Sequence, residues 1–406
     1  MTMKIRLMML AATVYSIALN ASAGPVDQPD VWLQGYGDET LVASNPARPN
    51  TVVAVIPQLY GTCLVYRSLD GGRSWSVPSI TIGACSRPDM AFSPEGRAYI
   101  AYVTYDPFIS NPTNYIFVIR SDDGGATWTV PSVAFNGVER GKVYDQPRIA
   151  ASSGGHVNMI AMEKAYPEVQ SGCVLGSIYE LKTTVTRSSN YASTWAAPAI
   201  VKLSHCPQTI RIASTPTGTV SVAADNDDAT INFATSSNGG ATYKHPAAFV
   251  VKDAAPQYGF DMKIGAKGTT HVVYTRNGGL PEPGVIGYTW SGAPYRSWAA
   301  PVTISDTATN LQFAPELTVR NCGGTSAIGV VWEDSRVEVD GSLTDIFYTE
   351  KLARNDTVWS PNIRVSDYSH DSQEHIASVN GGVFVTWGFI RGQTVGSRVV
   401  SGLSCR

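Results

Sequence analysis

One position of a repeated strand pattern carries ionisable side chains along most of the chain. Each copy consists of that residue, an apolar residue and then a turn rich in glycine or proline, and successive copies are 49 to 63 residues apart. The residues at this position are Thr40, Asp89, Arg148, Arg211, Asp261, Glu316 and His375. Arginine binds a carboxylate through paired hydrogen bonds, and carboxylates and imidazoles are common proton donors and acceptors in catalysis. These residue types suit recognition or cleavage of an acidic sugar.

Further candidate side chains flank the same position. Tyr144 and Asp145 precede Arg148, and Tyr258 precedes Asp261. The candidates that follow predicted second strands are Arg276 and Arg336. If the repeats stand in a circle, all of these groups converge on one opening, where guanidinium groups would hold a carboxylate and aromatic faces would cover the sugar ring.

A purely structural interpretation fits the same residues. If neighbouring repeats stand side by side, Asp89 lies near Arg148 and Arg211 lies near Asp261. The mutual attraction of such pairs offsets the free-energy cost of removing them from water. Structural ion pairs and active sites share this composition, so the sequence leaves both interpretations open.

A second repeat indicates the elements that position these groups. Residues 121–128 read SDDGGATW and residues 68–75 read SLDGGRSW, while residues 188–195 and 236–243 are weaker copies with Asn in place of Asp. Asp or Asn in a tight turn accepts backbone hydrogen bonds, glycine supplies positive φ, and the closing aromatic residue covers the turn. We call these four segments the repeat turns. Each predicts a turn between two strands.

The repeat turns resemble the Asp-box, or bacterial neuraminidase repeat, of the sialidase superfamily. This resemblance implies a β-propeller with one box per blade between the third and fourth strands, and an active site on the face opposite the boxes. Sialidases hold the substrate carboxylate with three arginines and use a tyrosine nucleophile assisted by a glutamate, with an aspartate as acid/base. As architecture, the resemblance covers nearly all of residues 24–406.

The resemblance also implies roles for the candidate residues. Tyr144 or Tyr258 would be the nucleophile, assisted by Glu316, and Asp145 would transfer the proton. Arg148 and Arg211 would hold the carboxylate. The predicted catalytic residues are therefore Asp145, Glu316, Tyr144 and Tyr258, and the predicted substrate-binding residues are Arg148, Arg211, Arg276, Arg336 and His375.

We predict an all-β fold, a seven-bladed β-propeller of four-stranded antiparallel blades. The last repeat ends without an outer strand, and residues 31–33 (VWL) stand alone near the other end of the chain. We expect this N-terminal strand to close the ring, which removes exposed sheet edges. The alternative is six blades, with the C-terminal repeat packed outside. No linker interrupts the repeats, so residues 24–406 are predicted to form a single domain.

Residues 1–23 are typical of a secretory signal peptide, with two basic residues, an apolar run and a small-residue cleavage site. We therefore expect a secreted or periplasmic protein, and a monomer. No later stretch has the roughly 18 apolar residues of a membrane span. Without Lys4 and Arg6, the 30 basic residues become 28 against 33 acidic residues, which predicts no basic face for nucleic acid.

Six cysteines in an exported chain predict disulfides. Pairing within repeats gives Cys63 with Cys85 and Cys173 with Cys206, which leaves Cys322 with Cys405. No CxxC spacing and no close histidine pair occurs, so we predict no metal and no cofactor.

Three functions remain open at this point, all with a glycan or polysaccharide as the partner. The first is a sialidase-like exo-glycosidase acting on acidic glycans. The second is a non-catalytic glycan-binding propeller or adhesin. The third is a polysaccharide lyase acting on uronates, in which a tyrosine or histidine removes a proton beside a carboxylate that arginine neutralises.

Overall fold

The computed structural model of the chain describes residues 31–33, 40–58, 61–105, 114–165, 180–204, 207–226, 228–245, 250–255, 259–276, 284–306, 311–322, 325–336, 344–351, 358–366, 371–380, 382–389 and 393–400. Nearly all of the regular structure in these residues is β-strand. The short helices are α1 (Gly137–Arg140), η1 (Ser153–Gly155) and η3 (Ala266–Gly268). None of the helices in the described part of the chain is long and apolar enough to cross a lipid bilayer.

The strands form antiparallel sheets in chain order. The first sheet contains β2 (Leu41–Asn45), β3 (Arg48–Pro57), β4 (Cys63–Ser68) and β5 (Ile80–Ile82), and the second contains β6 (Ser86–Phe92), β7 (Ala98–Tyr105), β8 (Asn114–Ser121) and β9 (Ser132–Asn136). The third contains β10 (Val143–Ala151), β11 (Val157–Ala165), β12 (Glu180–Ser188) and β13 (Ala199–Ile200), and the fourth contains β14 (Ile210–Ser214), β15 (Val220–Asp225) and β16 (Ile231–Ser236). The fifth contains β17 (Phe260–Ile264), β18 (Thr270–Arg276), β19 (Val285–Ser291) and β20 (Val302–Thr303), and the sixth contains β21 (Gln312–Cys322), β22 (Thr325–Asp334), β23 (Asp345–Lys351) and β24 (Ile363–Arg364). The last contains β25 (Asp371–Val379), β26 (Gly382–Phe389), β27 (Gln393–Val400) and β1 (Val31–Leu33).

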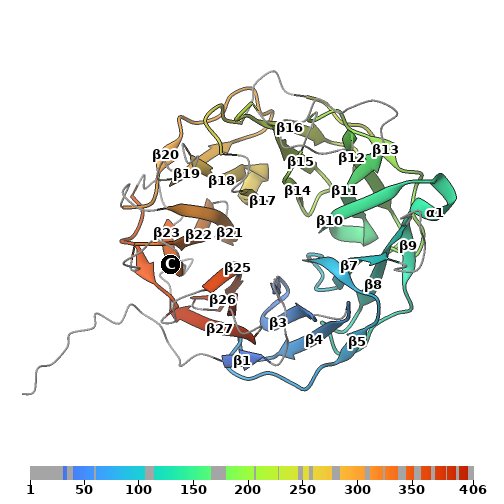
Figure 1. Ribbon diagram of the computed structural model, residues 1–406, viewed down its shortest axis with the longest axis horizontal. Coiled ribbons are helices and arrows are strands. Elements are labelled where there is room, and N and C mark those ends of the chain that lie inside the picture. Colours follow the sequence, from blue (N-terminus) through green and yellow to red (C-terminus); the bar gives the residue numbers. More distant parts are fainter. Residues whose placement is uncertain are drawn as a thin grey trace, which may run out of the picture.

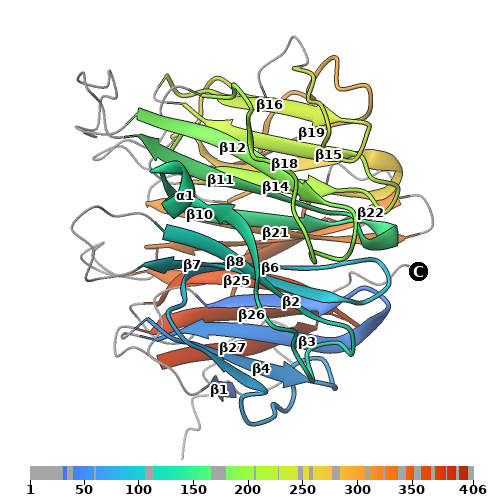
Figure 2. The same cartoon turned by 90° about the vertical axis from the view of Figure 1, so that its right-hand side faces the viewer.

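These sheets stand in a ring around a central axis, with one edge strand of each facing the centre (Figure 1). Figure 2 shows the ring from the side, where the strands of successive sheets lie one above another. The predicted all-β propeller with four-stranded antiparallel blades is confirmed. Within the described residues, six sheets have the full four strands, the blade number of the alternative prediction, and the sheet β14-β15-β16 has three.

The two ends of the chain close the ring. Strand β1 pairs antiparallel with β27, with Val31 opposite Gly396 and Leu33 opposite Thr394. This confirms the prediction that the N-terminal strand completes the C-terminal repeat. The pairing gives the last sheet its fourth strand and joins the two ends of the chain in one sheet.

Each sheet buries both faces because it packs between two neighbours. Along β7, Ile100 and Tyr102 belong to a core cluster shared with the first sheet, whereas Tyr99, Ala101 and Val103 belong to a cluster shared with the third. Successive side chains of a strand point to opposite faces, so a strand buried on both faces has a continuous apolar run. The repeats therefore form one body through the cores between their sheets.

Two tryptophans at the ends of repeat turns link their sheets to the preceding sheets. The Trp128 indole N–H donates to the Ser79 hydroxyl at 3.3 Å, and the Trp195 indole N–H donates to the Ser132 hydroxyl at 3.1 Å. In each pair the serine lies at or just before the outermost strand of the preceding sheet. The closing aromatic residue therefore joins neighbouring sheets as well as covering its own turn.

Hydrogen bonds join equivalent residues of the repeat turns whether the turn contains Asp or Asn, although the direction of the side-chain bond is reversed. Asp123 Oδ1 accepts from the Thr127 backbone N–H at 2.9 Å, and the Thr127 hydroxyl donates to Oδ2 at 2.6 Å. Asn190 Oδ1 accepts from the Thr194 N–H at 3.0 Å, and its side-chain amide donates to the Thr194 hydroxyl at 2.8 Å. Gly125 has φ of 96°. These contacts confirm the predicted turn chemistry.

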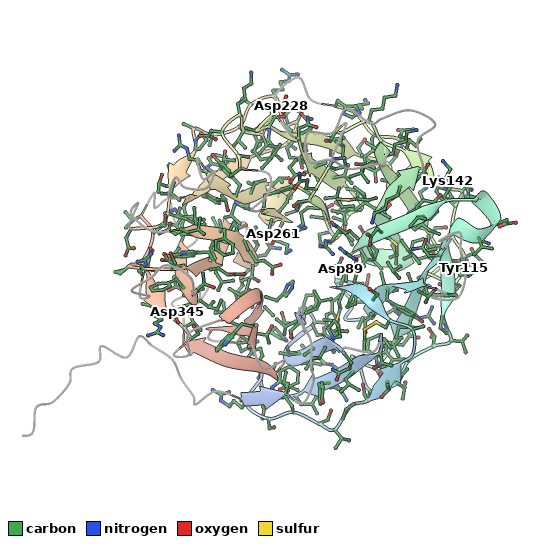
Figure 3. All side chains as sticks on the ribbon, in the orientation of Figure 1. Asp89, Tyr115, Lys142, Asp228, Asp261 and Asp345 are labelled. Atoms are coloured by element: carbon green, nitrogen blue, oxygen red, sulfur yellow. A yellow bond between two sulfur atoms is a disulfide. The ribbon has the colours of Figure 1, made fainter. Side chains whose placement is uncertain are left out.

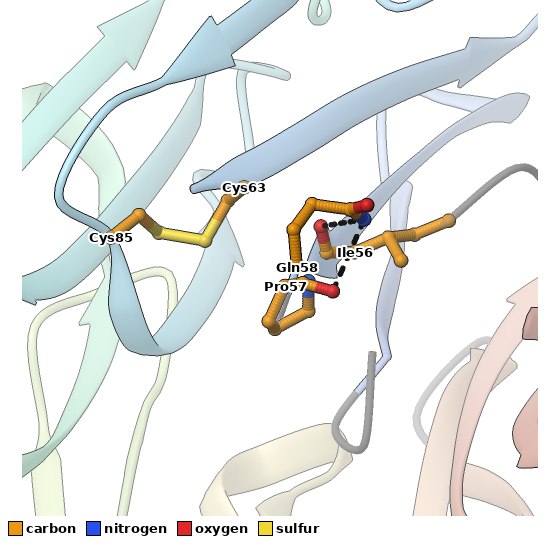
Figure 4. Close-up of a disulfide and its surroundings, with 5 residues drawn as sticks. All are labelled: Ile56, Pro57, Gln58, Cys63 and Cys85. Carbon is orange, nitrogen blue, oxygen red and sulfur yellow. Dashed lines mark hydrogen bonds between the residues drawn. A yellow bond between two sulfur atoms is a disulfide. The ribbon is translucent and has the colours of Figure 1, made fainter. Parts of the chain in front are cut away.

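A disulfide links Cys63 to Cys85, as predicted. Figure 4 shows the bridge near the end of β3, where the Gln58 side-chain amide donates to the carbonyls of Ile56 and Pro57. The bridge connects the start of β4 to the segment that enters β6, so it ties the first sheet to the second. Of the other predicted partners, Cys173, Cys206 and Cys405 lie outside the described residues.

Candidate functional site

A cavity of about 640 Å³ occupies the centre of the ring and is lined by the inner strands of all the sheets. Thr40 is buried, and the lining of its strand begins at Leu41. Asp89 and Asp261 extend close to the centre (Figure 3). The other six residues at the repeated position all line the cavity, and we call them the channel ring: Asp89, Arg148, Arg211, Asp261, Glu316 and His375.

The cavity extends from the channel ring toward the face that carries the repeat turns. Its lining follows the inner strands in the C-terminal direction as far as Phe92, Ala151 and Val379. The ends of these strands lie beside the repeat turns, since the Gly71 N–H of the first turn donates to the Asn50 carbonyl at the start of the second strand. The resemblance led us to expect a ligand on the opposite face, several of whose loops lie outside the described residues.

A β-bulge precedes the ring residue on β6, β10, β21 and β25. Three non-glycine residues with φ between 45° and 51° stand two positions before ring residues: Arg87, Gln146 and Ala314. Each is followed by proline, which has no N–H to donate and is therefore tolerated at bulges. A bulge bends its strand and changes the direction of the side chains that follow. The pattern X-Pro-charged at residues 87–89, 146–148 and 314–316 is therefore a local sequence signal for these members of the channel ring.

Asp261 is buried and lies between two cationic side chains, Arg211 and the exposed Lys263. Its Oδ1 lies 3.1 Å from Arg211 Nε, and its Oδ2 lies 3.0 Å from Lys263 Nζ. The Leu317 N–H of the next inner strand also donates to Oδ2 at 3.1 Å. Burial by itself raises the pKa of Asp261, but the charges of Lys263 and Arg211 outweigh it and lower the pKa to about 2. The sequence predicted the pair with Arg211 and missed Lys263.

Asp89 makes the same backbone contact on the other side of the ring. Its Oδ2 accepts the Ile149 N–H at 2.6 Å. Desolvation raises the pKa of Asp89, although the positive charge of Arg148 opposes this shift. The Arg148 guanidinium also donates to the Pro147 carbonyl at 3.2 Å. Asp89 and Arg148 are therefore neighbours, as predicted. At Asp89 the effect of desolvation on the pKa exceeds that of the positive charges, whereas at Asp261 the positive charges exceed desolvation.

Glu316 and His375 form the third group of the channel ring. His375 Nδ1 lies 2.8 Å from Glu316 Oε2, and the two side chains are 21% and 18% exposed. A carboxylate that accepts from Nδ1–H fixes the tautomer of a neutral imidazole, which leaves Nε2 as a proton acceptor. His375 could therefore act as a general base, with Glu316 orienting its imidazole ring.

Two of the remaining catalytic candidates, Tyr144 and Asp145, lie away from the cavity lining. Tyr144 is buried in the core between the second and third sheets, with its ring 4.8 Å from that of Phe135, and burial raises its pKa. Asp145 forms ion pairs with Arg87 at 3.1 Å and Lys164 at 2.5 Å. Tyr258 lies outside the described residues.

Arg276 and Arg336 also bind carboxylates of their own neighbourhoods. Arg276 Nε lies 2.5 Å from Asp253 Oδ2. Arg336 forms ion pairs with Asp334, at 2.6 Å, and Asp306, and its guanidinium lies 4.2 Å from the centre of the Phe347 ring. Neither arginine belongs to the cavity lining. The structure thus brings Arg148, Arg211, Glu316 and His375 into one cavity and places the other described candidates outside it.

The cavity carries more positive than negative side chains. Three carboxylates, from Asp89, Asp261 and Glu316, face four cationic residues. The cationic residues that line it are Arg148, Arg211, Lys263 and Arg320. Arg320 was not a candidate from sequence, and its guanidinium donates to the Val379 carbonyl at 3.2 Å. A surplus of cationic groups in an enclosed space favours an anionic ligand.

No protein-family model matches the chain, and no curated protein matches its sequence. Solved structures do resemble it. The BP39L lectin from Burkholderia pseudomallei has a TM-score of 0.62 at 14% identity, over 91% of this chain and 97% of the lectin. A polysaccharide lyase, an ulvan lyase bound to a GlcA(1-4)Rha3S unit, has a TM-score of 0.57 at 9% identity, over 90% and 95% of the two chains.

A third similar structure is the Hadza microbial sialidase Hz136, with a TM-score of 0.50 at 12% identity, over 86% of this chain and 73% of the sialidase. At these identities the likeness shows the fold alone. The chain therefore has a propeller fold that sialidases, lectins and a polysaccharide lyase share, all of them carbohydrate-related proteins.

Proposed function

We propose that this protein is an exported carbohydrate-binding propeller whose central cavity recognises an acidic glycan. The observation that carries the proposal is the cavity lining, in which four cationic side chains outnumber three carboxylates. Guanidinium groups hold carboxylates with directed hydrogen bonds, and an enclosed site strengthens those bonds. The carbohydrate-related proteins among the similar structures support the ligand class.

Binding ranks above sialidase-like hydrolysis because of how the candidate residues are distributed. The exo-glycosidase mechanism implied by the resemblance needs three arginines on one carboxylate and a tyrosine nucleophile beside it. Arg276 and Arg336 hold other carboxylates, and Tyr144 lies in the core. A role for Asp145 in such a reaction would therefore require a substrate position away from the described cavity, and Tyr258 lies outside the described residues.

The repeat turns fit the same proposal as folding elements. We interpret them as Asp-boxes, supported by the shared hydrogen bonds of Asp123 and Asn190. We also propose that residues 1–23 direct export and that residues 24–406 form one secreted domain. The disulfide between Cys63 and Cys85 supports an oxidising compartment.

A second candidate function is a uronate lyase, favoured by the contact between Glu316 and His375. In this reaction, Nε2 of neutral His375 would take the proton at C5 of a uronate. The glycosidic oxygen at C4 would leave with the electron pair of its bond, and a C4=C5 double bond would form. Arg148 or Arg211 would neutralise the carboxylate while negative charge develops next to it. Each cleavage would leave an unsaturated ring that absorbs in the ultraviolet.

The test combines binding and turnover on the same probes. Sialyllactose and an oligogalacturonate are titrated against the purified protein, with lactose as the neutral control, and each mixture is assayed for released sugar and for new ultraviolet absorbance. We expect binding of an acidic probe, no turnover, and a loss of about tenfold or more in affinity for Arg148→Ala at a temperature where the variant remains folded.

Each other outcome points to a different function. New absorbance that disappears in His375→Gln would establish the lyase. Released sialic acid that disappears in Arg148→Ala would establish the hydrolase. Equal binding of lactose and the acidic probes would overturn recognition of an acidic glycan.

A further inference from the structure

The junction between the fourth and fifth sheets departs from the repeat. At two earlier junctions, Trp128 and Trp195 donate their indole N–H to a serine of the preceding sheet, whereas Trp75 donates to the Gly72 carbonyl of its own turn. The equivalent Trp298 has a buried indole N–H without a hydrogen-bond partner among the described residues. Among the described residues the preceding sheet has three strands, and isolated bridges join its outer edge to residues on either side of 246–249, as between Thr235 and Lys244 and between Ile231 and Val251. A buried donor without an acceptor costs free energy, so this departure calls for an explanation.

A groove of about 500 Å³ lies at this junction. One wall is residues 250–253 of the fourth repeat, and the other is residues 296–301 of the fifth, including Trp298. Trp298 packs edge-on against Phe233, with the ring centroids 5.3 Å apart. One wall of the groove therefore contains an indole that, among the described residues, lacks the serine contact made by Trp128 and Trp195.

Cationic groups stand along the groove. Arg276 ends β18 opposite Val285, and Arg296 lies in the turn after Ser291, so the two arginines belong to opposite ends of β19. Seven residues of strand span about 20 Å. Arg276 is held by Asp253, whose other oxygen accepts from the Tyr274 hydroxyl at 2.9 Å. Arg296 forms no hydrogen bond or ion pair with any residue that the structure describes.

We propose that this groove is a second carbohydrate site that binds an extended acidic oligosaccharide. Guanidinium groups at its two ends suit a chain with more than one carboxylate, because a single sugar acid cannot reach both ends. The indole supplies an apolar surface for a sugar ring, and Asp253 can accept from sugar hydroxyls. The groove lies outside the lining of the central cavity, and the inference rests on the proposed recognition of acidic glycans.

The repeat supplies a matched control for the test. The tripeptide Arg-Ser-Trp occurs at residues 73–75 and again at residues 296–298, at the same place in the first and fifth repeats. Arg296 lines the groove, whereas Arg73 donates to the Asp70 carbonyl of its own turn. Arg296→Ala and Arg73→Ala therefore remove the same exposed side chain from equivalent turns.

Wild type and both variants are titrated with tetragalacturonate and with methyl galacturonide, and binding is followed by calorimetry and by the indole N–H resonance of Trp298. We expect Arg296→Ala to lower the affinity for tetragalacturonate by about tenfold, and Arg73→Ala to leave it unchanged. Neither variant should change the affinity for methyl galacturonide, because the single sugar binds in the central cavity. Tetragalacturonate should shift the Trp298 resonance.

Two results would overturn the groove site and remain distinct from failure of the proposed function. If the wild type binds tetragalacturonate but Arg296→Ala binds it equally well, the central cavity alone binds the chain. If a neutral cello-oligosaccharide shifts the Trp298 resonance as strongly, the groove does not select acidic chains. If the wild type binds neither acidic probe, both proposals fail.

Discussion

Asp89 and Asp261 occupy the same position on the inner strands of two sheets, yet their carboxyl groups differ in acidity. Each accepts the backbone N–H of the next inner strand, Asp89 from Ile149 and Asp261 from Leu317. Desolvation raises the pKa of Asp89 despite the charge of Arg148. Desolvation also opposes ionisation of Asp261, but two cationic neighbours lower its pKa to about 2.

The difference shows which part of the repeat fixes which property. The strand position fixes the backbone hydrogen bond, because both inner strands present the aspartate toward the next strand of the ring. The charge state depends on side chains that the repeat does not specify, since Lys263 has no counterpart two residues after Asp89, where Ala91 stands. A propeller can therefore keep its architecture while the chemistry of its channel changes residue by residue.

The largest expected effect comes from removing each carboxylate. Asp261→Ala leaves Arg211 and the Leu317 N–H without their acceptor, and we expect a loss of about 3–5 kcal/mol in the free energy of unfolding. Asp89→Ala should cost less, about 1–3 kcal/mol, because it mainly deprives the Ile149 N–H of its acceptor. Urea unfolding at neutral pH measures both values. Equal losses of unfolding free energy in the two variants would contradict the conclusion that Asp261 has stronger cationic partners than Asp89.

A smaller effect that depends on pH separates the charges from the hydrogen bonds. Asp261 has a lowered pKa, so it adds stability above its unfolded pKa of about 3.9, and this contribution is lost as pH falls toward 2. Asp89 has a raised pKa, so its ionisation reduces stability as pH rises above about 4. Asp261→Asn should therefore lower the melting temperature at pH 7 and less so at pH 3.

The matched variant Asp89→Asn should leave the melting temperature at pH 7 unchanged or higher, because the amide oxygen can still accept the Ile149 N–H. Calorimetry at both pH values checks the pair. If both variants shift the melting temperature in the same direction at pH 7, the proposed role of Lys263 and Arg211 is wrong.

The smallest effect is expected in the repeat turns, where charge matters least. Asp123→Asn creates the side chain that Asn190 already has in an equivalent turn, so we expect a loss of no more than about 1 kcal/mol at pH 7. Burial alone raises the pKa of Asp123, but hydrogen bonds from Thr127 and Ser121 lower it to about 2. The wild type should therefore lose stability between about pH 4 and pH 2 through this group, and the variant should not.

Thermal unfolding of Asp123→Asn and of Asn190→Asp, as the reverse control, measures the effect at both ends of that range. A loss of several kcal/mol for either variant would show that the charge, and not the turn hydrogen bonds, holds the repeat together.

Much of the fold could be predicted because its signals are local. The repeat turns close their hydrogen bonds within five residues, as between Asp123 and Thr127, so their sequence is sufficient to identify them. The channel ring was predictable in position because the inner strands repeat. The residues around the channel ring were less predictable, because Lys263 and Arg320 line the cavity from positions that no repeat marks. Three of the bulges before ring residues coincide with prolines that lie outside the repeated pattern.

The sequence by itself determined the propeller, its closure by residues 31–33, the turn chemistry and the disulfide between Cys63 and Cys85, because each depends on a repeated pattern or on residues near one another in the chain. Only the tertiary structure decided which candidates share a cavity. Tyr144 has a suitable side chain but packs in a core against Phe135, and Arg336 is held by an ion pair with Asp334. Contacts between residues some fifty positions apart, such as Arg211 with Asp261, form only when the sheets stand side by side.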